Sequence, residues 1–315
     1  MASSKSVVFA ALFANGAIAV MKFTGFLLTG SAAMLSETFH SVSDTGNQVF
    51  LLIGLRYGGK EASREHPFGY GKAQFFYSFL VSVLLFGIAG WESARHGYDA
   101  LVHPHPPATG AATLPVVGVT FPGVWVNYAV LAGAIAFEGY ALSKAYTNMR
   151  GQMAENEWDD LVEAFHKSSD VTVLTAFTED TIAVTGAGLA LLGIYLSRAT
   201  GNPAYDAVAA ILIGLLLMGF AVALAWENKR LLLGESLPYR QELELRRIVA
   251  DWDGVVKVVD FRTVYFGPER VIVTADVSFD ADLDTGEIDD RITAIEAALT
   301  DANDDVDKVY IEPET

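Results

Sequence analysis

The chain has 315 residues, of which 52% are hydrophobic, and its mean hydropathy is +0.33. This apolarity is high for a soluble protein and typical of a chain that lies largely in lipid. There is no cysteine, which excludes disulfides and thiolate metal sites and leaves His, Asp and Glu as strong ligands. Residues 234–315 hold 21 acidic and 8 basic residues, a net charge of −13, so nucleic-acid binding by this part is excluded.

Six apolar segments are predicted to be membrane-spanning helices, because each is long enough to cross a hydrocarbon core of about 30 Å. The first runs directly into the second, so we interpret it as a permanent span and not as a cleavable signal peptide. Lys and Arg residues gather in the loops on one side, and only Arg95 and Arg198 flank the other, which places both termini in the cytoplasm. The segments cover approximately residues 7–29, 34–56, 73–95, 117–146, 172–197 and 203–227.

The pattern changes after Leu237-Pro238, where charged and alternating segments replace the long apolar ones. The order α-β-β-α-β is typical of a small α+β domain of ferredoxin-like type. We therefore predict a six-helix transmembrane domain at 1–233 and a cytoplasmic domain at 234–315, whose small size favours homodimer contacts. The predicted elements are a helix at 239–252, strands at 255–266 and 270–280, a helix at 285–302 capped by Asp284 or Thr285, and a strand at 306–312.

The stretch SETFHSVSD, residues 36–44, places Glu37, His40 and Asp44 on one face of the second apolar segment. Placing a charged side chain at the centre of a membrane costs at least about 2.5–3.5 kcal/mol of free energy, so charged residues there indicate a functional or structural role. His40 and Asp44 are four residues apart and together make half of a tetrahedral site for a metal such as zinc. The alternative is a His–Asp hydrogen bond that joins two helices. Glu37 lies nearer the outer mouth, where a solvated carboxylate is ordinary, and is a secondary candidate at the metal entrance.

The fifth apolar segment carries a second acidic feature, Glu179 and Asp180, with Asp180 near the middle of the membrane. Adjacent residues point about 100° apart on a helix. The two carboxylates therefore cannot face one site equally, and one serves as ligand while the other packs or receives protons. Asp170 lies ten residues before Asp180 and is a secondary candidate for an exit path or an N-cap. Asp206 opens the sixth segment and is expected to cap its own helix.

For three further ionisable residues the sequence leaves two interpretations open. His66, in the loop REHPFGYGKAQFF at 64–76, is either part of a tight turn or a secondary metal ligand. Lys22 and Glu138 also lie at membrane depth, and the sequence identifies no partner for either, so both either snorkel or pair.

Taken together, the HSVSD motif, the loop HPFGYGKAQ, the acidic patch in the fifth segment and the α-β-β-α-β tail resemble the cation diffusion facilitator family. The resemblance covers essentially the whole chain. It implies a homodimeric transporter that exports a divalent metal from the cytoplasm in exchange for protons. Zn²⁺ is then expected as the transported substrate, with Mn²⁺, Fe²⁺ or Co²⁺ as alternatives, and no prosthetic group is expected.

The resemblance implies two metal ligands in the second helix and two in the fifth. The first two are His40 and Asp44. The fifth-helix pair is usually His-x-x-x-Asp, so Asp180 takes the Asp position while Ala176 stands at the His position. Glu179 or water is then the fourth ligand, and the loss of a His strengthens the case for Mn²⁺. Because no His follows His166, we expect the tail to be a dimerisation module without a His-based zinc site.

Two other classes of protein could also place metal ligands within membrane-spanning helices. An intramembrane metal hydrolase would be expected to carry a His-Glu-x-x-His motif, which the sequence lacks, so we expect no enzyme. A non-transporting metal-binding membrane protein remains an alternative. The expected location is the inner or plasma membrane of a prokaryotic cell.

Overall fold

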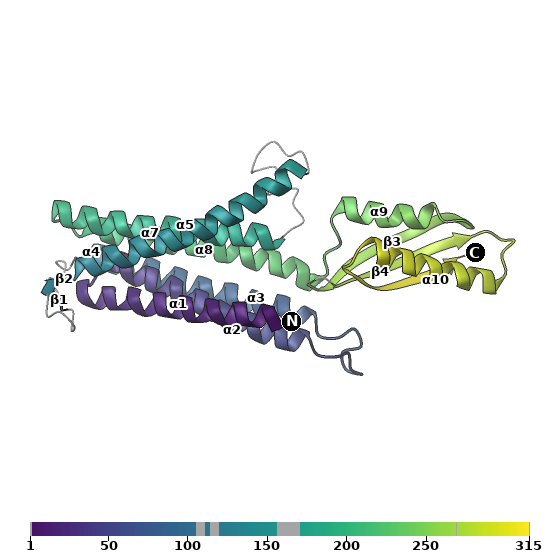
Figure 1. Cartoon of the computed structure of the whole chain (residues 1–315), viewed down its shortest axis with the longest axis horizontal. Helices are drawn as coiled ribbons and strands as arrows, with labels where there is room; N and C mark the ends of the chain where they lie inside the picture. Colours follow the sequence, from purple (N-terminus) through teal and green to yellow (C-terminus); the bar gives the residue numbers. More distant parts are fainter. Residues whose placement is uncertain (1, 105–110, 114–119, 156–170, 269, 315) are drawn as a thin grey trace. The chain divides into compact units, whose positions relative to one another are not determined.

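The computed structural model describes residues 2–104, 111–113, 120–155, 171–268 and 270–314 (Figure 1). The chain forms two compact units, the first from Met1–Phe50 and Leu80–Ala225, and the second from Leu51–Phe79 and Trp226–Thr315. The loop that follows the second helix therefore belongs to the same unit as the C-terminal residues. The domain boundary predicted at residue 233 stays a prediction.

The first unit is built from long helices. Three helical stretches, at 72–102, 177–200 and 204–233, are long and apolar enough to cross a membrane, considering the described residues alone. Helices of this length and composition are typical of an integral membrane protein, while the count of six spans stays a prediction. The helical elements are α1 (Ala2–Thr29), α2 (Ala32–Gly58), α3 (Lys72–Leu84), a π-helical stretch η1 (Leu85–Trp91), α4 (Glu92–Val102), α5 (Val124–Glu155), α7 (Val171–Thr200) and α8 (Ala204–Leu233).

The start of the fourth predicted segment was wrong. Residues Thr120–Pro122 form a short strand, β2, which pairs antiparallel with β1 (Ala111–Thr113), and helix α5 begins only at Val124. Pro122 explains the difference, because proline lacks the backbone N–H and clashes with the preceding turn inside a helix. The other predicted segments agree with the helices to within several residues at each end.

Small residues bring the backbones of α4 and α8 into contact. A Cβ atom at Gly97 would lie 2.8 Å from the backbone nitrogen of Ile211, and one at Gly214 would lie 2.5 Å from the backbone nitrogen of Ala94. These separations are shorter than real Cβ contacts, so only glycine fits at either position. Such small-residue packing is the usual basis of close helix association within membranes.

Asp206 joins α8 to the beginning of α2. Its Oδ1 accepts a hydrogen bond from the Ser31 hydroxyl at 2.7 Å, and its Oδ2 accepts one from the backbone N–H of Ala32 at 2.6 Å. The carboxylate thus satisfies a free N–H at the start of α2. Asp206 lies in the first turn of α8, as expected, but its hydrogen bonds cap the neighbouring helix α2.

Replacing Asp206 by Ala is expected to lower the free energy of unfolding by about 1–2 kcal/mol, because a partly buried helix cap is lost. Thermal unfolding of the purified protein in detergent measures the effect. Ser31→Ala removes one of the two hydrogen bonds to Asp206 and also the one that the Met34 N–H donates to the Ser31 hydroxyl, so it should cost a similar amount. An unchanged melting temperature for Asp206→Ala would contradict the role of this cap.

The C-terminal residues of the second unit, from 239 to 314, form a three-stranded sheet and two helices. The strand order is β3-β4-β5, with β3 and β4 antiparallel and β4 and β5 parallel. The predicted order α-β-β-α-β is confirmed, and Asp284 caps the last helix through a capping box with Glu287. The ferredoxin-like assignment stays a prediction. The elements are α9 (Tyr239–Ala250), β3 (Val255–Gly267), β4 (Arg270–Phe279), α10 (Thr285–Ala302) and β5 (Val306–Glu314).

The loop between α2 and α3 packs on this sheet within the second unit. The Phe68 ring lies 5.2 Å from the Phe266 ring and 6.4 Å from the Tyr310 ring, measured between centroids. Gly71 lies against the end of β3, where an added Cβ would be 2.4 Å from the carbonyl oxygen of Phe266. The glycine therefore allows the loop backbone to touch the strand.

Gly71→Ala is expected to destabilise this docking by about 1–3 kcal/mol, because the added methyl group would overlap backbone that cannot move away cheaply. Hydrogen exchange of the β3 amides should then speed up. Gly151→Ala, where nothing lies within 4 Å of an added Cβ, serves as the control and should cause no loss. Equal protection of β3 in both variants would show that the close contact does not matter.

Candidate metal site

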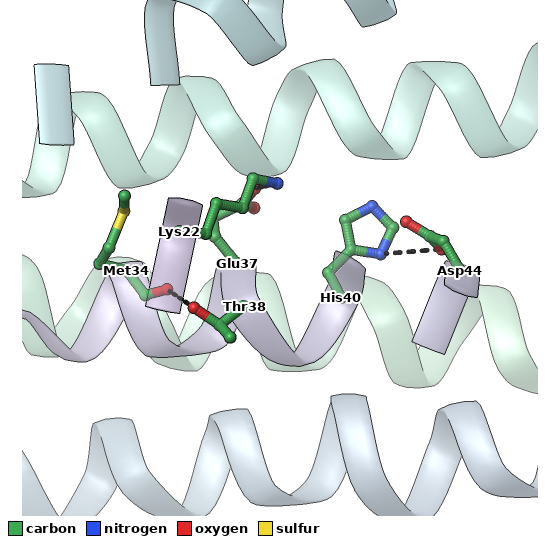
Figure 2. A network of polar contacts seen from close by, with 6 residues as sticks. All are labelled: Lys22, Met34, Glu37, Thr38, His40 and Asp44. Carbon is green, nitrogen blue, oxygen red and sulfur yellow. Dashed lines mark hydrogen bonds and ion pairs between the residues drawn. The ribbon is translucent and has the colours of Figure 1, made fainter. Parts of the chain in front are cut away.

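The candidate site is built on α2, where His40 and Asp44 face each other. Nδ1 of His40 lies 3.5 Å from Oδ1 of Asp44, and the two side chains are 4% and 21% exposed (Figure 2). Neither ring nitrogen of His40 has a hydrogen-bond partner among the described residues, although both are buried. Among the described residues His40 makes no hydrogen bond to another helix, so the helix-joining hydrogen bond considered as an alternative is not seen there. Because neither ring nitrogen is engaged in a hydrogen bond there, the buried imidazole is available to bind a metal.

The acidic pair predicted from the fifth segment lies on α7, and both side chains are partly buried. Glu179 interacts electrostatically with His40, Asp44 and Asp180. No group of three His, Asp or Glu side chains among the residues that the structure describes is close enough to hold one metal ion. The four-ligand set of His40, Asp44, Glu179 and Asp180 therefore stays a prediction.

Two other positions bear on this set. Ala176, at the expected His position, belongs to α7 and lies one turn before Asp180. Asp170, a secondary candidate, lies outside the described residues. The His expected from the resemblance is thus missing from the sequence itself, and the carboxylates of Glu138 and Glu179 interact electrostatically with His40 and Asp44.

Glu37 is not the solvated carboxylate that the sequence led us to expect. Its side chain is completely buried, and its Oε2 accepts a hydrogen bond from Nζ of Lys22 at 2.7 Å. Lys22 comes from α1 and is itself only 5% exposed. A charged group buried this deeply needs a partner of opposite charge, and Lys22 and Glu37 are each other's partner.

His66 lies in an exposed turn of the second unit. Its ring stacks on Tyr70 with 4.2 Å between centroids, and its backbone exchanges hydrogen bonds with Ser63 at 3.0 and 3.1 Å. These contacts agree with the structural-turn interpretation. A role for His66 as a metal ligand finds no support in its surroundings and stays untested.

Sequence reasoning left Lys22 and Glu138 without a role. The structure pairs Lys22 with Glu37, and it brings Glu138 of α5 into electrostatic interaction with His40 and Asp44. The available signal was the cost of a lone charge inside an apolar segment. That cost shows that a partner must exist, but the sequence does not say which helix supplies it.

Comparison with known proteins places these features in a family. Residues 8–233 match the cation efflux transmembrane domain. The mitochondrial proton-coupled zinc antiporter SLC30A9 of Mus musculus is 30% identical over 274 residues, which are 87% of this chain and 46% of that protein. Metal tolerance protein C4 of Arabidopsis thaliana is 25% identical over 280 residues, 89% of this chain and 58% of that protein.

The cation-efflux pump FieF of Yersinia enterocolitica is 26% identical over 257 residues, 80% of this chain and 74% of that protein. The chain spans about half the length of the zinc antiporter that it matches. The domain match covers more than half of this chain and includes the whole of α2 and α7. The chain therefore belongs to the cation diffusion facilitator family, a family of transporters and not of enzymes.

Proposed function

We propose that the protein is a secondary transporter that exports a divalent metal cation, most readily Zn²⁺, from the cytoplasm in exchange for protons. The observation that carries the proposal is the buried imidazole of His40, which lacks hydrogen-bond partners among the described residues and lies beside Asp44 in a helix of a cation efflux domain. The name of the mouse relative, a proton-coupled zinc antiporter, supports both the ion and the coupling.

Proton coupling follows from the chemistry of these ligands. Metal binding needs a neutral imidazole and ionised carboxylates, so protons and metal compete for the same atoms. A site open to the cytoplasm binds the metal and releases protons, and a site open to the outside receives protons that displace the metal. His titrates in the physiological range when unperturbed, which suits it to this exchange.

The proposed ligands are His40 and Asp44 from α2 with Asp180 from α7, and Glu179 or water as the fourth. Imidazole favours a borderline ion such as Zn²⁺, while a site with only one His shifts toward oxygen ligands and makes Mn²⁺ the second candidate. We further propose a homodimer joined through the C-terminal domain, with both termini in the cytoplasm of a prokaryotic cell.

Transport can be tested with purified protein in lipid vesicles that contain a zinc-sensitive dye. An imposed proton gradient is expected to drive zinc uptake, and uptake is expected to move protons the opposite way. Vesicles that show no metal flux in either direction would refute transport, and flux indifferent to the proton gradient would refute the exchange.

The metal is decided by a competition assay in the same vesicles. Zinc uptake is measured in the presence of excess Mn²⁺, for the wild type and for Glu179→Gln. If Glu179 is a ligand, its replacement should weaken the binding of both ions. The binding of Mn²⁺ should weaken more, because Mn²⁺ depends more on oxygen donors. Unchanged competition would leave water as the fourth ligand.

A further inference from the structure

The ion pair of Lys22 and Glu37 joins α1 to α2 inside the membrane unit. Only one oxygen of the Glu37 carboxylate is used by Lys22, at 2.7 Å. The other, Oε1, is buried and has no hydrogen-bond partner among the described residues. It lies against α7, where a Cβ added to Gly186 would be 2.7 Å from it. Three helices therefore meet at one carboxylate that is only half satisfied.

This carboxylate is close to the candidate metal site. Glu37 precedes His40 by three residues and Asp44 by seven, so all three side chains project from one side of α2 (Figure 2). Lys22 and Glu37 both interact electrostatically with His40 and with Asp44. Fixed charges act strongly on one another where water is excluded. A change in the charge of the pair should therefore change the binding energy of a cation at the site.

We propose that the Lys22–Glu37 pair sets the affinity of the His40–Asp44 site for its metal, an inference that rests on the proposed function. Lys22 neutralises a carboxylate that would otherwise add a full negative charge one helical turn from His40. The pair thereby keeps the site weak enough to release the ion, as a transporter requires. Lys22 and Glu37 act through the field at the site, as positioning residues and not as ligands.

The sign of the effect distinguishes this role from a structural one. If the pair only holds α1 against α2, then breaking it from either side weakens zinc binding. If it tunes the field, Lys22→Met leaves extra negative charge and strengthens binding, whereas Glu37→Gln leaves extra positive charge and weakens it. Removing both charges together should restore the wild-type affinity.

The test is zinc binding by the full-length purified protein in detergent, measured by competition with a fluorescent chelator. We expect Lys22→Met to raise the affinity about three- to tenfold and Glu37→Gln to lower it by a similar factor. The double variant should lie within about twofold of the wild type. Lys22→Arg keeps the charge and should behave as the wild type.

Changes of the same sign in both single variants, or changes below about twofold in both, would overturn the inference. Should Lys22→Met fail to fold, as judged by gel filtration, Glu37→Gln is compared with the double variant. Recovered affinity in the double variant then supports the inference, and a further loss overturns it. A wild type that binds no zinc would refute the proposed function itself, and this inference with it.

Discussion

Replacing Asp44 by Ala is expected to lower zinc affinity at least about tenfold and to abolish proton-driven zinc flux. Asp44 supplies a carboxylate 3.5 Å from the buried imidazole of His40, and a site with so few donors loses much of its binding energy with any one of them. Asp180→Ala is expected to have a similar effect if α7 supplies the third ligand. Zinc titration of the detergent-solubilised protein and flux into vesicles measure the two quantities.

The chain offers a matched control for this substitution. Asp99 and His103 form a second Asp–His pair with four-residue spacing, at 3.2 Å, but both side chains are about two-thirds exposed. Asp99→Ala should leave zinc affinity and flux unchanged, because two exposed side chains compete poorly with water for the metal. Flux that survives in the Asp44→Ala, Asp180→Ala double variant would show that the ligands are assigned wrongly.

Gly214→Val is expected to destabilise the membrane unit by about 3 kcal/mol or more. A Cβ at Gly214 would lie 2.5 Å from the backbone nitrogen of Ala94 and 2.7 Å from the carbonyl oxygen of Gly90. The clash is with helix backbone, so α4 and α8 must separate, and overpacking of this kind costs up to about 3 kcal/mol even where side chains can adjust. The loss should appear as a lower melting temperature in detergent.

Gly219, five residues further along α8, has nothing within 4 Å of an added Cβ. The same change there, Gly219→Val, is expected to leave the melting temperature nearly unchanged, since β-branched residues are tolerated where space is open. If Gly214→Val were as stable as Gly219→Val, the two helices would not depend on this close contact.

The C-terminal elements could be predicted almost residue by residue because their signals are local. Strands β3 and β4 alternate in polarity along the chain, and Asp284 with Glu287 forms a capping box over four residues. The start of α5 was missed because hydropathy was followed through Pro122, whose backbone restriction should have outweighed it.

The candidate site could be predicted only in part. His40 and Asp44 share a helix, so their spacing alone brings them together. The partners of Lys22 and Asp206 lie on other helices, and periodicity within one segment carries no information about which helices touch. The same limit explains why the acidic pair on α7 could be proposed as a source of a ligand without its partners being known, and why Glu37 was assigned to solvent.

Under the proposed function, the imidazole of His40 is the one imidazole that binds the transported zinc, together with oxygen ligands. X-ray absorption at the zinc edge, on protein loaded with one zinc per chain, tests it directly. We expect a single imidazole nitrogen with oxygens at about 2.0–2.1 Å, and loss of the imidazole signal in His40→Ala. A spectrum with two or more imidazoles, or one unchanged in His40→Ala, would contradict the site described here.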